Sequence, residues 1–126
     1  MKPSRPAALI VDDQPFVGMV ASDILRESGF DTFHAYDASD ATAVLDEHPE
    51  IEVVVTEAQL PGDVTGIELC RRLSRQRPNL RLVVTATAPE QHASAVPSGA
   101  RMLRKPYASR ELRTVAGSEP LLLIDA

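Results

Sequence analysis

Short apolar runs alternate with amphipathic stretches along this chain, and this alternation constrains the fold more than any other feature. Runs rich in β-branched and aliphatic residues predict strands at residues 7–11, 32–36, 51–56, 80–85 and 100–103. Apolar residues at helical spacing predict helices between and after these strands. They cover residues 15–28, 39–47, 66–76, 89–96 and 109–116, with Ser39 and Ser109 as caps and a short, weak fourth helix.

A regular alternation of strand and helix predicts a parallel sheet with helices on both faces. The third run, IEVVVT, is almost continuously apolar, which is typical of a central strand. Ligands of such sheets bind at the carboxyl ends of the strands. The polar residues that end or follow the predicted strands are therefore the candidates for a functional site.

The composition predicts one ordinary globular domain. The chain has 126 residues, of which 44% are hydrophobic and 25% charged, and this is enough to build a core. No apolar run approaches the ~20 residues of a membrane helix, and the N-terminus does not resemble a secretion signal. Cys70 is the only cysteine, so no internal disulfide can form and we expect a cytoplasmic protein.

The charge and the aromatic content bear on the choice of partner. The formal net charge is −5, there is no tryptophan, and aromatic residues make up 4% of the chain. A surface for phosphate backbones or stacked bases needs the opposite composition. We therefore expect neither nucleic acid nor a membrane as a direct partner.

Polar residues at four predicted strand ends form the strongest functional signal. Asp12 and Asp13 end the first strand, Glu57 follows the third, Thr85 ends the fourth and Lys105 follows the fifth. Two carboxylates about 4 Å apart repel by roughly 1 kcal/mol in water and about 4 kcal/mol at an effective dielectric of 20. The cluster therefore needs a metal cation such as Mg²⁺, a proton, or the lysine among the carboxylates. The alternative for the acidic pair is a helix N-cap.

Four segments at these strand ends resemble the receiver domain of two-component response regulators. They read LIVDDQP, VVVTEAQLPG followed by GIEL, LVVTATA and MLRKPY. The resemblance covers about residues 7–116. It implies a flavodoxin-like (βα)5 three-layer sandwich with strand order 2-1-3-4-5. It also implies a single receiver-like domain over residues 1–126, with an apolar tail at residues 117–126.

The resemblance implies a phosphoryl site with a metal beside it. In the family an acidic pair and a backbone carbonyl hold Mg²⁺, and an aspartate accepts the phosphoryl group from a histidine kinase. A threonine or serine binds that group, a lysine pairs with it, and a tyrosine or phenylalanine often stands three residues before the lysine. The corresponding positions here are Asp12, Asp13, Glu57, Gln59, Thr85, Met102 and Lys105.

Two of these positions depart from the family pattern. Glu57 stands where the family has the acceptor aspartate, and its carboxylate reaches one methylene farther. A shift of ~1 Å can cost about a hundredfold in a transfer that depends on in-line placement, so we expect ordinary phosphorylation to be lost or very poor. The longer arm could instead contact Lys105 or the Thr85 hydroxyl and imitate part of the phosphorylated state. Met102 has no ring to swing inward.

These residues favour a signalling module that is not an enzyme and acts through contacts with proteins. Its partners would be a histidine kinase, a phosphotransfer protein or an output protein, and a homodimer is a further option. One alternative is a phosphorylatable, Mg²⁺-dependent receiver domain in a histidine kinase phosphorelay. Another is mononucleotide binding or metal-dependent phosphohydrolysis, but the sequence has no GxxxxGK[ST] or GxGxxG run.

The C-terminal tail contains four consecutive apolar residues after Pro120. A free segment of this kind does not favour water. Three explanations stand: the tail folds back on the domain, it pairs with an edge or helix face of a neighbour, or the chain is a piece of a longer protein.

Overall fold

The computed structural model describes residues 5–117, and within this range it contains five parallel strands and four α-helices. The strand order β2-β1-β3-β4-β5 confirms the predicted flavodoxin-like topology. The strands are β1 (Ala7–Val11), β2 (Asp31–Ala35), β3 (Ile51–Glu57), β4 (Arg81–Ala86) and β5 (Arg101–Arg104). The α-helices are α1 (Pro15–Glu27), α2 (Ala38–Glu47), α3 (Gly66–Gln76) and α4 (Ser109–Ala116).

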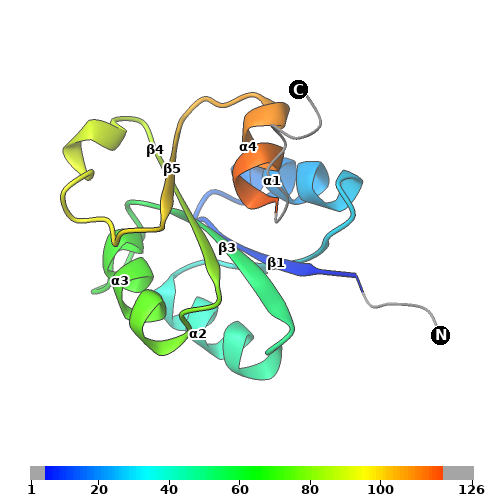
Figure 1. The fold of residues 1–126 in the computed structure, drawn as a ribbon, viewed down its shortest axis with the longest axis horizontal. Coiled ribbons are helices and arrows are strands. Elements are labelled where there is room, and N and C mark those ends of the chain that lie inside the picture. The colour runs from blue at the N-terminus through cyan, green and yellow to red at the C-terminus, as the bar shows by residue number, and fades with distance from the viewer. Residues whose placement is uncertain (1–4, 118–126) are drawn as a thin grey trace.

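Helices cover both faces of the sheet, as the alternation predicts. Helices α1 and α4 lie on one face, and α2 and α3 lie on the other (Figure 1). Successive residues of a strand point to opposite faces, so Leu9 of β1 joins the core under α2 and α3, whereas Ile10 joins the core under α1 and α4. Both faces are covered, which explains why the central strands are apolar without alternation.

Two helices begin differently from the prediction. The cap of α2 is Asp37, whose Oδ1 accepts a hydrogen bond from the Asp40 N–H at 2.8 Å, so the prediction that Ser39 caps this helix is wrong. Ser109 is the first residue of α4 rather than its cap. The carboxylate of Glu111 instead accepts a hydrogen bond from the Ala108 N–H at 2.7 Å. A carboxylate accepts hydrogen bonds from the free N–H groups at a helix N-terminus as well as a hydroxyl does. Asp37 provides this carboxylate at the start of α2, and Glu111 provides it at the start of α4.

The connection between β4 and β5 lacks the helix predicted for residues 89–96. Only the 3₁₀ turn η1 (Pro89–Gln91) forms, and this turn buries no residue. Backbone turns follow, in which the His92 carbonyl accepts hydrogen bonds from the N–H groups of Ala95 and Val96. The stretch has too few apolar residues at helical spacing to anchor a helix, and Pro97 stops one from continuing.

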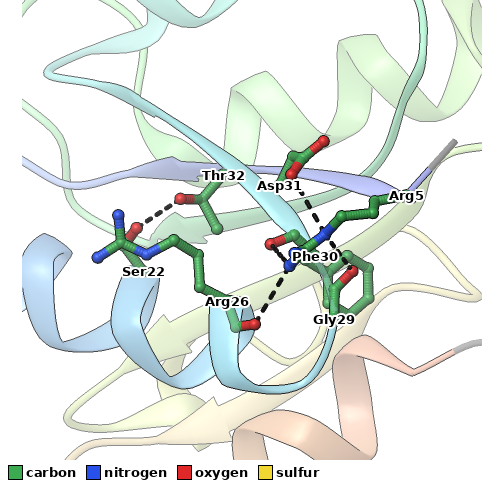
Figure 2. Close-up of polar contacts among 7 residues, drawn as sticks. All are labelled: Arg5, Ser22, Arg26, Gly29, Phe30, Asp31 and Thr32. Carbon is green, nitrogen blue, oxygen red and sulfur yellow. Dashed lines mark hydrogen bonds and ion pairs between the residues drawn. The ribbon is translucent and has the colours of Figure 1, made fainter.

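Arg5 ties the start of the described chain to the end of α1 (Figure 2). Its guanidinium donates hydrogen bonds to the carbonyls of Arg26 at 3.3 Å, Gly29 at 3.2 Å and Phe30 at 3.0 Å, and it pairs with Asp31 at 3.3 Å. The last carbonyls of a helix have no partner inside the helix, and a cation there also favours the helix dipole. Arg5 therefore fixes the turn that carries α1 into β2, a role that no sequence pattern indicated.

Candidate functional site

The parallel register brings the ends of β1, β3, β4 and β5 to one edge of the sheet. Glu57, the last residue of β3, lies beside Thr85 of β4. Asp12 follows the last residue of β1, and Lys105 follows the last residue of β5. The side chains that the sequence singled out therefore come from four different strands at the same edge.

Lys105 lies between two carboxylates of this edge. Its Nζ donates a hydrogen bond to Glu57 Oε2 and lies 3.7 Å from Asp12 Oδ2. The side chains are 17% exposed for Lys105, 16% for Glu57 and 6% for Asp12. Water screens such a cluster poorly, so each carboxylate needs the ammonium nearby. One lysine thus supplies the positive charge that the acids require.

Asp12 is held by the turn that leads into α1. Its Oδ1 accepts a hydrogen bond from the Gln14 N–H at 2.8 Å, and its own N–H donates to the Ala35 carbonyl at 3.1 Å. The cap of α1 is Gln14, which makes no side-chain cap hydrogen bond. Asp12 therefore shapes the loop before the helix, and the N-cap alternative for the acidic pair is wrong.

The backbone around Glu57 is packed tightly against the start of α3. A Cβ atom on Gly66 would lie 1.7 Å from the Glu57 carbonyl oxygen, so only glycine fits there. That carbonyl also accepts a hydrogen bond from the Thr56 hydroxyl at 3.0 Å. The Ala58 N–H donates to the Thr85 carbonyl at 2.8 Å. Sequence reasoning missed the role of Gly66, although a glycine that opens a predicted helix is a signal of close backbone approach.

The remaining predicted site residues make fewer contacts. Thr85 is buried at the same edge, Asp13 is half-buried and Gln59 is exposed. Within residues 5–117 none of these three side chains makes a hydrogen bond or ion pair with another protein group. Met102 is partly buried and packs against the core under α2 and α3. Within residues 5–117, side-chain hydrogen bonds and ion pairs among the predicted site residues are thus limited to those of Lys105 with Glu57 and Asp12.

Tyr107 lies two residues after Lys105 and was not among the predicted site residues. It is partly buried against the core under α1 and α4. Burial raises the pKa of its hydroxyl, and the negative charges of Asp12 and Glu57 raise this pKa further. The tyrosine therefore lies within electrostatic reach of both carboxylates. The available signal was its place at the end of the MLRKPY segment, two residues after the lysine.

The described residues do not fit a magnesium site as they are arranged. Oxygen ligands from Asp12, Asp13 and Glu57 have the right chemistry for Mg²⁺. However, the Glu57 carboxylate faces the Lys105 ammonium, and one Asp12 oxygen is already bonded to a backbone N–H. In the part of the chain that the structure describes, no group of three or more His, Cys, Asp or Glu side chains could hold a metal ion. In this arrangement the Lys105 ammonium is the positive charge that lies nearest to the carboxylates of Asp12 and Glu57.

Comparison with known protein families agrees with this architecture. The family model of the response regulator receiver domain matches residues 8–116. The chain belongs to this family. Receiver domains are signalling modules of two-component systems that interact with histidine kinases and output domains, and they are generally not enzymes. Within residues 5–117 no helix of this receiver domain is long and apolar enough to cross a membrane.

Three solved structures illustrate the similarity of this receiver domain to known proteins. The receiver domain of NtrX from Brucella abortus is 28% identical, with a TM-score of 0.77 over 86% of this chain and 93% of that chain. A CheY-like receiver domain protein from Methanospirillum hungatei is 25% identical, with a TM-score of 0.72 over 86% and 88%. A receiver protein from Sinorhizobium medicae is 23% identical, with a TM-score of 0.81 over 87% and 90%, and this likeness bears on the fold alone.

Proposed function

We propose that this receiver domain signals through contacts with other proteins, without conventional aspartyl phosphorylation. Glu57 takes the place of the phosphoacceptor and serves as a permanent carboxylate substitute. The observation that carries the proposal is the contact between the Glu57 carboxylate and the Lys105 ammonium.

The chemistry of transfer explains why this contact opposes phosphorylation. An acceptor carboxylate must present a free oxygen in line with the phosphorus atom of the donor. In this protein one Glu57 oxygen is engaged by Lys105, which stabilises the carboxylate in its unmodified form. The longer side chain also carries the carboxylate away from the place of an aspartate, and ~1 Å of misplacement can cost about a hundredfold in rate.

The same contact reproduces part of a phosphorylated site. The Glu57 carboxylate pairs with the lysine that would pair with a phosphoryl group. It supplies one negative charge, whereas a phosphoryl group supplies about −2 and three acceptor oxygens. The Thr85 hydroxyl makes no hydrogen bond to another group of residues 5–117 and is not engaged by this imitation. Glu57 therefore reproduces the contact of a phosphoryl group with Lys105 but not its contact with Thr85. Met102 has no aromatic ring that could transmit a change at Thr85 to the surface.

The partners we propose are proteins of a two-component pathway in the cytoplasm: a histidine kinase, a phosphotransfer protein or an output protein. The acidic net charge and the near absence of aromatic residues argue against direct contact with nucleic acid. The contact face that we propose is the surface around η1, β5 and α4, because β5 ends directly before Lys105 and α4 begins four residues after it. A homodimer remains part of the proposal as an alternative mode of contact.

The second candidate is a phosphorylatable, Mg²⁺-dependent receiver domain. It is favoured by the presence of Asp12, Asp13, Thr85 and Lys105 at the positions that the family uses. In this case Glu57 would have to leave Lys105 and turn toward a metal ion.

Intact mass after incubation with Mg²⁺ and acetyl phosphate separates the two candidates. We expect the natural chain to keep its mass, because Glu57 is held by Lys105. The variant Glu57→Asp should gain one phosphoryl group, because the shorter acid releases the lysine and moves the carboxylate back toward Asp12. Glu57→Gln is the matched control, with the longer arm but no nucleophilic carboxylate. A phosphoryl gain by the natural chain that Glu57→Gln abolishes would establish the second candidate instead.

A further inference from the structure

The solvent-facing side of the N-terminal half of α1 is apolar, whereas Asp23 and Glu27 continue this side toward the end of the helix. Phe16, Met19 and Val20 have helical spacing and are 77%, 60% and 49% exposed, respectively. The opposite side of the helix carries Ala21 and Leu25, which are buried in the core under α1 and α4. We call Phe16, Met19 and Val20 the α1 apolar face. These side chains do not take part in packing the helix onto the sheet.

The segment that follows α4 has matching chemistry. Helix α4 ends at Ala116 and lies beside α1 on the same face of the sheet (Figure 1). Beyond the described residues, positions 121–124 are three leucines and an isoleucine. We propose that this apolar tail segment, residues 121–124, docks in cis on the α1 apolar face.

The reach of the chain agrees with this placement. Both helices begin at the carboxyl end of the sheet and end at the opposite end, so the chain leaves α4 beside the C-terminal end of α1. From Glu27 back to Val20 or Phe16 is a rise of about 10–16 Å at 1.5 Å per residue. Residues 121–124 lie four to seven positions past Gly117, an extended reach of about 13–23 Å. The apolar residues of the tail therefore match the span to the α1 apolar face.

The docked segment would cover a surface close to the candidate site. Helix α1 begins three residues after Asp12, and Phe16 is in its first turn. A protein that binds the α1 apolar face would have to displace the segment first. The tail would thus compete with partners of this face, whether or not Glu57 is ever phosphorylated.

Disulfide trapping tests the proposal in the full chain. The variant combines Val20→Cys with Leu122→Cys, and its control combines Ser39→Cys with Leu122→Cys, since Ser39 is exposed on α2 across the sheet. The native Cys70 does not interfere, because burial raises the pKa of its thiol to about 12. We expect mild oxidation of dilute protein to give a closed monomer at least about tenfold faster than in the control. No disulfide, equal rates, or a linked dimer in place of the closed monomer would overturn the proposal.

Binding of an apolar fluorescent dye gives a second readout with opposite signs. The variant is the full chain with Leu121→Ser, Leu122→Ser and Leu123→Ser. If the tail covers the α1 apolar face, these changes uncover it and dye fluorescence rises. If the tail does not dock, the changes only remove exposed leucines, and a fall or no change in fluorescence would contradict the proposal. Neither test touches Glu57, so failure here leaves the proposed function standing.

Discussion

Two connections leave neighbouring strands of the sheet, and they are built differently. The connection after β3 enters α3, whose apolar face buries Leu69, Cys70 and Leu73, and Gly66 lets this helix start against the Glu57 carbonyl. The connection after β4 contains only η1, and no residue between positions 87 and 100 is fully buried. Apolar packing therefore fixes the half of the site that carries Glu57.

In the other half, polar contacts add to the packing of side chains that are only partly buried, such as Val96 and Met102. Arg104 of β5 pairs with Glu90 of η1 at 2.6 Å and donates a hydrogen bond to the Thr87 carbonyl at 3.3 Å. Both partners of the ion pair are exposed, and exposed pairs contribute little to stability. The strand end that carries Glu57 is therefore the better packed of the two, and we expect a partner to reshape the segment leading to β5 and Lys105 at lower cost.

Truncation of one apolar side chain in each connection should give the largest difference in the free energy of unfolding. Leu73→Ala on α3 leaves a cavity and should lower the free energy of unfolding by about 2–5 kcal/mol. Val96→Ala in the β4–β5 connection removes a partly exposed side chain and should cost less than about 1 kcal/mol. Urea unfolding of both variants measures this. Equal losses would show that the two connections are packed alike.

The substitution Gly66→Ala should have the next largest effect on the free energy of unfolding. Gly66→Ala places a Cβ against the Glu57 carbonyl and should cost about 1–3 kcal/mol or more. The matched variant is Gly99→Ala, where φ is +94° but no atom lies within 4 Å of the added Cβ, so only backbone strain is introduced. Amide NMR shifts should change around Glu57 and Lys105 in the first variant and stay local in the second. A Gly66→Ala protein with unperturbed shifts at Glu57 would contradict the close approach.

Loss of the Glu57 charge should shift the titration of Tyr107. The carboxylate raises the pKa of the tyrosine, so Glu57→Gln should lower that pKa. Near-ultraviolet absorbance during alkaline titration follows the phenolate, with Tyr36→Phe as the background that leaves one tyrosine to observe. The control Glu90→Gln removes a charge from the other connection and should leave the titration unchanged. An unchanged titration in Glu57→Gln would show that the natural Glu57 carboxylate does not act on Tyr107.

The Arg104–Glu90 pair should give the smallest effect, and one that depends on pH and salt. The hydrogen bond from Arg104 holds the pKa of Glu90 below its ordinary value of 4.5. The pair therefore stabilises the fold above about pH 4.5, and this stabilisation disappears as the pH falls through the lowered pKa. Glu90→Gln should remove this part of the pH dependence of Tm at low salt and leave little difference at high salt. If Glu90→Gln lowered the stability of the fold more than Leu73→Ala does, the connection after β4 would be the more strongly held of the two.

Local patterns predicted most of the fold. Apolar periodicity placed Ala7–Val11, Gly66–Gln76 and Ser109–Ala116 at their observed bounds, because burial on both faces leaves a strong signal in the sequence. The short helix after Pro89 was wrong, since a few apolar residues at helical spacing cannot offset the cost of ordering a helix without burial.

Features that depend on tertiary contacts were not predictable. The carbonyl contacts of Arg5, the steric need for Gly66 and the direction of the Glu57 side chain arise only when distant segments meet. The sequence left open whether Mg²⁺ or Lys105 balances the carboxylates, because both satisfy the same charge requirement. The choice depends on side-chain reach, which spacing along the chain does not encode.

A crystal structure of the full chain grown with excess Mg²⁺ would show whether Lys105 or a metal ion holds the Glu57 carboxylate. We expect Glu57 Oε2 to remain in contact with Lys105 Nζ and no metal ion to be bound by Asp12 and Asp13. A metal ion coordinated by the Glu57 carboxylate together with the acidic pair, with Lys105 turned away, would contradict this expectation.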